Sequence, residues 1–423
     1  MTTGVLTLDY ARSLDADDPL AKYRKRFHIP QDKEGKDLIY LCGNSLGLQP
    51  TNTRSFIEQE LSDWQRFGVA GHMMAKKPWI DYHEEVSKSM AKVVGGKTEE
   101  VVCMNSLTVN LHLMMVSFYR PSAKRFKILI EKGAFPSDQY AVASQLRFHG
   151  YDPDLALIEV APDPDKAWID PAKIAKTIEE EGDSIALVML GGVNYLSGQL
   201  FDMESITQIA HKKGCLVGFD LAHAAGNVPL ALHDWQVDFA VWCSYKYLNA
   251  GPGGIAGCFV HDSIDKQNIP RFEGWWGHNR ADRFKMSERF EPMNTVEAWQ
   301  LSNPPIFQLA ALAASLEIFD EVGMAAITQK RKSLTGFLEN LIDERVGEDV
   351  IQTPRDATMR GAQLSLKIST PGPGFLKSLE DKGVVCDFRE PNIVRAAPAP
   401  LYNTYTEIYQ FVEILAEELG ANG

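Results

Sequence analysis

Between residues 100 and 260, short apolar runs alternate with stretches of helical spacing, and this alternation restricts the fold that the chain can adopt. The runs are too apolar for a sheet with one face in water, so they predict an α/β fold whose mostly parallel sheet is covered by helices. The predicted strands are RFKILIEKG (125–133), SIALVML (184–190), CLVGFDLAH (215–223) and VDFAVWCSYK (237–246), and the predicted helices are DQYAVASQLRFHG (138–150) and MESITQIAHKKG (203–214).

The 423 residues are too many for one small core, so we expect a large domain and a smaller one. The pattern predicts an irregular arm over 1–50 that contributes to the small domain, a large domain over 51–304, and a small C-terminal α/β domain over 305–423. The last helix begins with Thr404 and Glu407 at capping-box spacing. The remaining predicted elements are helices at 52–66, 304–322, 324–345 and 373–383 and strands at 362–368, 384–390 and 392–398.

Composition narrows the class of protein. The chain is 45% hydrophobic and 23% charged, which is typical of a globular protein. Its net charge of -13 argues against nucleic acid or an anionic membrane as the main partner, and no segment has the pattern of a signal peptide or a membrane helix. Six scattered cysteines without a C-x-x-C pair predict reduced thiols in a cytoplasmic protein. The histidines have no metal-ligand spacing, so we expect no metal site.

Lys246 and Asp220 are the first residues that indicate a chemistry. Both follow apolar runs, and in a parallel sheet both would lie at carboxyl ends of strands, where open α/β sheets bind their ligands. Alone, an aspartate is usually a cap and a lysine usually extends to water. Together they match pyridoxal 5'-phosphate (PLP), which needs a Schiff-base lysine and an acid facing its ring nitrogen.

A phosphate cradle and a glycine-rich turn would complete such a site. Ser106, Leu107 and Thr108 precede an apolar helix, whose first amides either bind phosphate or are simply capped. The glycines at 251, 253, 254 and 257 follow Lys246 and do not form G-x-G-x-x-G, which argues against a dinucleotide site. They either provide backbone room beside the lysine or form a tight turn.

The segments FDLAHAAGNVPL (219–230) and CSYKYLNAGPGG (243–254) resemble the PLP-lysine region of kynureninases, enzymes of the aspartate aminotransferase superfamily with PLP fold type I. The resemblance extends over about residues 39 to 410 and is closest to the animal-type branch. It implies a large PLP-binding domain and a small C-terminal domain. Further matching segments are YLCGNSLGLQP, NSLTVNLHL, AFPSDQYA, EGWWGH, SNPPI and VVCDFREPNIVRAAPAPLYN.

The resemblance implies a role for each matching residue. Lys246 would bind PLP covalently and act as base, Tyr245 would bind phosphate and take part in proton transfer, and Asp220 would face the pyridine nitrogen. Arg395 would bind the substrate carboxylate. The residues expected at the cofactor in the same subunit are Leu107, Thr108, Phe135 (stacked on the ring), Pro136, Ser137, Asp138, Asp220, His223, Tyr245 and Lys246. Trp275 and Asn303 are expected to reach the cofactor from the neighbouring subunit of a homodimer. The residues expected at the substrate are Ser45, His72, Asn303 and Arg395.

The implied reaction is hydrolysis of the Cβ–Cγ bond of kynurenine or 3-hydroxykynurenine, to alanine and an anthranilate, in tryptophan catabolism or NAD synthesis. His72 and Asn303 match residues that favour 3-hydroxykynurenine. One position departs from the pattern, because relatives have serine or threonine where this chain has Gly191. The alternatives are a cysteine desulfurase or selenocysteine lyase, an aminotransferase, and a PLP-fold protein that binds without catalysis.

Overall fold

The computed structural model describes residues 6–368 and 374–420. Its centre is a seven-stranded sheet of order β2-β8-β7-β6-β5-β3-β4, in which β3 to β7 are parallel and β8 is antiparallel to both of its neighbours. The predicted mostly parallel sheet is therefore confirmed. The strands are β2 (Val101–Cys103), β3 (Lys127–Glu131), β4 (Leu157–Val160), β5 (Ile185–Gly191), β6 (Leu216–Asp220), β7 (Phe239–Trp242) and β8 (Gly257–Val260).

Helices cover both faces of this sheet, because successive side chains of each strand point to opposite faces and both sets are apolar. On β3, for example, Leu129 belongs to one core cluster, whereas Ile128 and Ile130 belong to the other. The first face packs against α4 (Tyr82–Val94), α8 (Pro171–Glu181), α9 (Met203–Lys212) and α10 (Ile306–Val322), and the second against α5 (Leu107–Phe118) and α6 (Pro136–Phe148).

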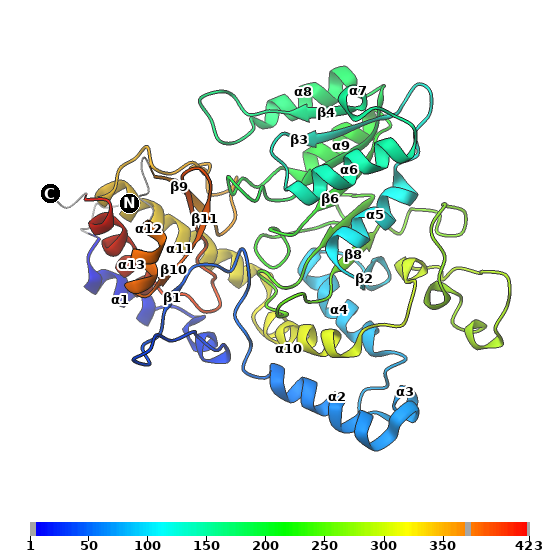
Figure 1. Cartoon of the computed structure of the whole chain (residues 1–423), viewed down its shortest axis with the longest axis horizontal. Coiled ribbons are helices and arrows are strands. Elements are labelled where there is room, and N and C mark those ends of the chain that lie inside the picture. Colours follow the sequence, from blue (N-terminus) through cyan, green and yellow to red (C-terminus); the bar gives the residue numbers. More distant parts are fainter. Residues whose placement is uncertain (1–5, 369–373, 421–423) are drawn as a thin grey trace.

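A third core cluster joins the two ends of the chain (Figure 1). Here α1 (Leu8–Ala16) packs against α13 (Tyr405–Glu418), which in turn packs against α11 (Met324–Arg345). Two small sheets belong to this part of the molecule. They are the parallel pair β1 (Ile39–Tyr40) and β10 (Val384–Val385), and an antiparallel sheet of β11 (Asp387–Arg389), β12 (Ile393–Ala396) and β9 (Leu364–Lys367).

The sequence interpretation is wrong in three places. The arm is not irregular, because it contributes α1 and β1 to the third core cluster. The predicted strand 384–390 is two strands in different sheets, β10 and β11. The predicted strand that carries Lys246 ends at Trp242, so the lysine lies four residues beyond β7.

The other helices agree with their predictions. The helix predicted over 52–66 is α2 (Thr53–Phe67), and the one predicted over 373–383 is α12 (Phe375–Asp381), with Pro373 outside the described residues. The capping box at α13 is present, since Thr404 Oγ1 accepts from Glu407 N and Glu407 Oε2 accepts from Thr404 N. The short helices α3 (Gly71–Met74) and α7 (Pro153–Ala156) complete the set.

Over the residues that the structure describes, no helix combines the length and the apolar character required to cross a bilayer. The boundaries of the large and the small domain at residues 50 and 304 stay predictions. The helix that follows the second boundary, α10, packs against α2 and α4 (Figure 1).

A buried ion pair attaches the N-terminal arm to α11. Lys330 Nζ lies 2.7 Å from Asp18 Oδ2, and the two side chains are 6% and 4% exposed. Burial lowers the pKa of Lys330, and the carboxylate of Asp18 opposes that effect. Without Asp18 the ammonium group would lose its counter-charge in a site that excludes water.

We predict that Asp18→Asn lowers the free energy of unfolding by about 3 kcal/mol, because a buried lysine then remains unpaired. Asn keeps the Oδ1 that accepts from Leu20 N, so the local turn is preserved. The matched control is Asp320→Asn at the exposed pair with Lys92, expected to cost less than about 1 kcal/mol. Urea unfolding of both variants measures the difference, and equal losses would contradict the prediction.

Candidate active site

The carboxyl ends of β3, β5 and β6 and the loop after β7 surround a cleft. This is the edge at which open α/β sheets bind ligands. Its lining contains most of the residues singled out from the sequence. They are Leu107, Thr108, Glu131, Phe135, Ser137, Asp138, Gly191, Val193, Tyr195, Asp220, Ala222, His223, Tyr245 and Lys246.

Lys246 and His223 form the polar centre of the cleft. Lys246 Nζ donates to His223 Nε2 at 2.9 Å, and His223 Nδ1 is buried without a partner among the described residues. Burial lowers the pKa of His223 well below its usual range, and the positive charge of Lys246 acts in the same direction. The imidazole is therefore neutral and accepts a hydrogen bond from the lysine.

Asp220 and Asp138 place two carboxyl groups in the same buried space. Asp220 Oδ1 accepts from Ala222 N at 2.7 Å, while Asp138 Oδ1 is buried without a partner in the described chain. Burial raises the pKa of Asp220, and the Ala222 amide and the charge of Lys246 oppose this rise. Burial and the negative charges of Asp220 and Glu131 raise the pKa of Asp138 well above its ordinary value. Asp138 is therefore more readily protonated than an exposed aspartate.

The N-terminus of α5 provides backbone N–H groups at the cleft. Leu107 and Thr108 are the first residues of this helix and both line the cleft. The N-cap residue Ser106 makes no side-chain hydrogen bond to the first turn, so its side chain does not cap these amides. Amides at a helix N-terminus stabilise a phosphate through hydrogen bonds and the helix dipole.

Phe135 and Tyr195 border the cleft as a pair of aromatic rings. Their centroids are 5.2 Å apart in an edge-to-face arrangement, and Lys246 Nζ lies 5.9 Å from the centroid of Phe135. Phe135 directly precedes α6, whose first turn carries Pro136, Ser137 and Asp138. Ser137 and Asp138 line the cleft, whereas Pro136 does not.

The loop that carries Lys246 is held by the N-terminal arm. Gly47 N donates to Tyr245 O at 2.8 Å, and a Cβ at residue 47 would lie 2.2 Å from Lys246 O. Gly47 is thus the glycine that gives the lysine backbone room. Gly251 and Gly253 have φ of 89° and 65° with no atom within 4 Å of an added Cβ, so they form a tight turn that requires left-handed backbone.

Arg395 approaches the cleft from β12. It is buried, its Nη1 donates to Tyr195 O at 2.6 Å, and its Nη2 pairs with Asp387. Its Nε is buried without a partner among the described residues. Arg395 does not itself line the cleft, but it contacts Tyr195, which does.

Four other residues chosen from the sequence lie outside the cleft lining of this chain. Ser45 and His72 are half-buried, and the His72 ring packs edge-on against Trp79 at 5.5 Å. Asn303 is exposed, and Trp275 is 41% exposed with its indole N–H donating to Arg283 O.

Tyr195 and Glu131 are lining residues that sequence reasoning did not select. Glu131 is the last residue of β3 and lies near the end of the predicted strand 125–133, so its position at a carboxyl strand end was a signal that could have identified it. Tyr195 lies in a loop after β5, and nothing in the local pattern distinguishes it.

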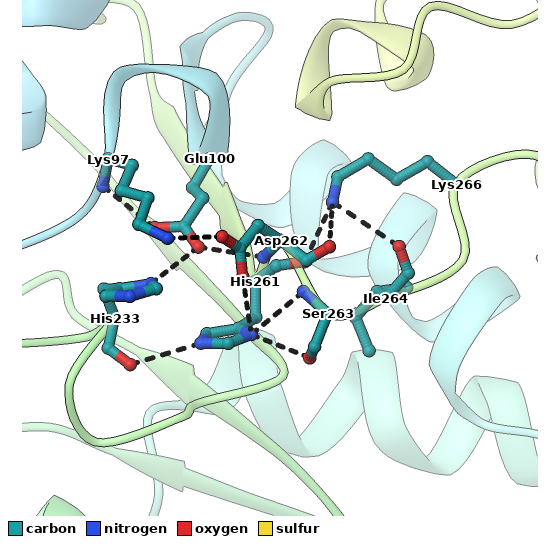
Figure 2. Close-up of polar contacts among 8 residues, drawn as sticks. All are labelled: Lys97, Glu100, His233, His261, Asp262, Ser263, Ile264 and Lys266. Atoms are coloured by element: carbon teal, nitrogen blue, oxygen red, sulfur yellow. Dashed lines mark hydrogen bonds and ion pairs between the residues drawn. The ribbon is translucent and has the colours of Figure 1, made fainter.

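A second polar cluster lies at the other edge of the sheet, where β2 begins and β8 ends (Figure 2). Glu100, His233, His261 and Asp262 bring potential ligand atoms within 4.8 Å of one another, although they are far apart in sequence. Their groups already bond one another: Glu100 Oε1 pairs with His233 Nδ1 at 2.9 Å and accepts from Asp262 N at 2.8 Å.

Two ammonium groups also belong to this cluster. Lys97 pairs with Asp262, and Lys266 Nζ donates to His261 O at 2.9 Å. Because these ammonium groups bring positive charge to the cluster and its members already bond one another, we interpret it as a hydrogen-bond network that joins the start of β2, the end of β8 and the loop that contains His233.

Comparison with known proteins decides the family. The chain is 58% identical to the kynureninase of Myxococcus xanthus over 98% of this chain and 99% of that one, and 52% identical to the kynureninase of Koribacter versatilis over 96% of each. This chain belongs to the kynureninase family.

Two family models match parts of the chain. The model of the kynureninase C-terminal domain matches residues 327–415, and the model of the DegT/DnrJ/EryC1/StrS aminotransferase family matches residues 75–231. The animal-type branch stays a prediction.

Solved structures confirm PLP fold type I. A cysteine desulfurase from Thermococcus onnurineus superimposes with a TM-score of 0.75 at 18% identity and covers 97% of this chain and 98% of that one. A C-DES mutant with glycine covalently linked to its PLP cofactor has the same TM-score at 17% identity, over 90% of this chain and 96% of that one. At these identities the likeness concerns the fold alone.

The residues of the cleft fit PLP, the cofactor of this family. An amine, a carboxyl group anchored by a backbone amide, an aromatic ring and helix-terminal N–H groups face one space, and Asp138 and His223 each offer a buried polar atom that has no partner in the described chain. Lys246, Asp220, Phe135 and the start of α5 would hold the cofactor in the way that the sequence resemblance implies.

The desulfurase alternative loses support from the cysteines. All six are in the described part of the chain; five are buried and Cys386 is half-buried. Burial raises the pKa of Cys386 to about 12, so it is a poor thiolate nucleophile.

We predict that Gly47→Ala reduces covalent PLP at Lys246 at least several-fold, because its methyl group would overlap Lys246 O and displace the loop. Borohydride reduction followed by peptide mapping measures the modified lysine. Gly336→Ala is the control, since no atom lies within 4 Å of its added Cβ inside α11. Equal labelling of both variants would contradict the prediction.

Proposed function

We propose that this chain hydrolyses the Cβ–Cγ bond of L-kynurenine and 3-hydroxy-L-kynurenine, releasing L-alanine with anthranilate or 3-hydroxyanthranilate. The observation that carries the proposal is that a member of the kynureninase family has Lys246 and Asp220 at one cleft on the carboxyl edge of its sheet. Such a reaction would serve tryptophan catabolism or NAD synthesis.

Bound PLP supplies a ring that withdraws electrons from the substrate and stabilises negative charge at its reacting carbons. Asp220 would face the ring nitrogen and favour its protonated form, and its contact with Ala222 N fixes the orientation of the carboxyl group. Lys246, hydrogen-bonded to neutral His223, is placed to take the proton from the substrate Cα.

Hydrolysis then requires water at the Cγ carbonyl and a proton at Cβ. The water oxygen becomes part of the carboxylic acid product, and Cβ becomes the methyl group of alanine. Burial raises the pKa of Tyr245, so its phenol is protonated at neutral pH and is a candidate proton donor to Cβ; Lys246 is the other candidate.

Arg395 is the proposed site for the substrate α-carboxylate. Its guanidinium is fixed by Tyr195 O and Asp387, and its Nε–H has no partner among the described residues. A fixed planar guanidinium binds a carboxylate with less loss of conformational entropy than a lysine does.

The proposed assembly is a homodimer whose two sites are shared. Trp275 and Asn303 would reach the cleft of the partner subunit, which agrees with their exposure and their absence from the cleft of their own chain. Phe272, Phe284 and Met286 are 57%, 59% and 71% exposed near Trp275, and an apolar surface of this kind favours contact with a second copy.

The direct test is an assay of the purified protein with PLP and each substrate. We expect equimolar alanine and anthranilate (or 3-hydroxyanthranilate) without any added keto acid, which separates hydrolysis from transamination. We further propose that 3-hydroxykynurenine is preferred, through His72 and Asn303. If no alanine forms, the proposed hydrolysis is wrong. If kcat/KM is higher for kynurenine than for 3-hydroxykynurenine, only the proposed substrate preference is wrong.

For Arg395→Lys we predict a fall in kcat/KM of about 10-fold or more, because one ammonium group cannot replace the guanidinium at both the protein and the substrate. Arg360→Lys is the matched control: Arg360 is equally buried and paired with Glu339, but it does not contact the cleft. It is expected to lower stability and leave kcat/KM within about 2-fold. Similar kinetics in the two variants would remove Arg395 from the substrate site.

A further inference from the structure

Glu131 is a buried carboxyl group at the end of β3 for which the reaction as described has no role. It is 3% exposed and lines the same cleft as Lys246 and Asp220. Both of its carboxyl oxygens lie 3.2 Å from Gly191 N, the last residue of β5. The contact joins the ends of two neighbouring parallel strands beyond their paired residues, which end at Leu129 and Val188.

Gly191 connects this carboxyl group to Asp220. In the sheet Gly191 pairs with Asp220 on β6, and the next amide, Gly192 N, donates to Asp220 O at 2.7 Å. The backbone of Asp220 is therefore held by a segment that Glu131 itself holds. A Cβ at residue 191 would lie 3.0 Å from Glu131 Oε1, so the glycine leaves the space that this carboxyl group occupies.

The charges around Glu131 are those of the cofactor site. Burial raises the pKa of Glu131 to about 7, the Gly191 amide lowers it, and the charge of Asp220 raises it. Glu131 in turn contributes to the raised pKa of Asp138. The titratable groups that face the same cleft are Asp138 on α6, Asp220 on β6, His223 after β6, Tyr195 after β5, and Tyr245 and Lys246 after β7.

We propose that Glu131 is a positioning residue of the PLP site: it holds the amide of Gly191, whose neighbour Gly192 donates to the Asp220 backbone, and in its ionised form it adds a second negative charge at the end of the cleft that would receive the ring nitrogen. The proposal rests on the proposed function, because it requires PLP bound with its ring nitrogen at Asp220. It also gives a reason for glycine at position 191, since a larger residue would displace the carboxyl group.

A negative charge at this place favours a protonated ring nitrogen, and it exists only above the pH at which Glu131 ionises. The contribution of Glu131 to PLP affinity should therefore depend on pH. Glutamine has the same shape and an oxygen that accepts from Gly191 N, but it carries no charge at any pH. The ratio of PLP dissociation constants between Glu131→Gln and the unmodified protein isolates this contribution, because the other titrating groups are common to both.

The experiment measures the Kd of PLP at pH 5.5 and pH 8.5 by titration of the apoprotein. We expect equal Kd values within about 2-fold at pH 5.5, and a Kd about 10-fold weaker for Glu131→Gln at pH 8.5, which corresponds to one pKa unit of interaction. A ratio that is the same at both pH values, or no difference at pH 8.5, overturns the proposal.

Two further variants separate positioning from general damage. Glu100→Gln removes a fully buried carboxylate at the opposite edge of the sheet (Figure 2) and should lower stability without a pH-dependent change in the Kd ratio. Gly191→Ala should weaken PLP binding at both pH values, because its methyl group would displace the side chain of residue 131 in either background. The extra loss at pH 8.5 should be absent in the Glu131→Gln background, since no charge remains there to displace. An equal pH-dependent loss in both backgrounds would contradict the proposal.

Apoprotein stability gives the last control. Because burial opposes the ionised form of Glu131, Glu131→Gln should be at least as stable as the unmodified protein at pH 8.5. A lower melting temperature together with weaker PLP binding would indicate misfolding and contradict the proposal.

The results also separate the two proposals. If covalent PLP at Lys246 is absent in the unmodified protein, the proposed function fails. If it is present and the ratio of Kd values does not change with pH, only the role of Glu131 fails.

Discussion

The structure depends on keeping one amine and three carboxyl groups together out of water at the carboxyl edge of the central sheet. Lys246, Asp138, Asp220 and Glu131 line one cleft, and burial raises the pKa of each carboxyl group. An isolated buried charge is too costly to persist, so such groups are stable only with partners and fixed backbone amides. The Ala222 and Gly191 amides provide these contacts, and a bound ring nitrogen would add a further positive charge.

The parts of the chain outside the sheet support this edge from two directions. From the arm, Gly47 contacts the backbone of Tyr245 and Lys246. From the C-terminal part, Arg395 donates to the backbone of Tyr195, a residue of the cleft. The arm is in turn anchored to α11 by the Asp18–Lys330 pair. Sequence segments that are more than 300 residues apart thus meet at one site, which explains why the arm is ordered and not irregular as expected.

Much of the fold and of the site was predictable from local pattern. Apolar runs identified β3, β5, β6 and β7, and the same runs indicated Asp220 because a polar residue at a strand end is conspicuous. Contacts between distant segments were not predictable in this way. Glu131 follows an apolar run just as Asp220 does, but its role depends on Gly191, 60 residues later. The network of Glu100 and His233 joins residues separated by 133 positions, and spacing along the chain contains no sign of it.

By itself the sequence determined the α/β class, the parallel sheet and the pair Lys246 and Asp220, because periodicity and strand ends are local properties of the chain. Only the tertiary structure decided which carboxyl groups share the cleft and how burial shifts the pKa of each. It also decided that Gly47, from the arm, gives the backbone of Lys246 its room. The physical reason is that desolvation and close approach depend on neighbours brought together by folding, and those neighbours lie on different strands and at opposite ends of the chain.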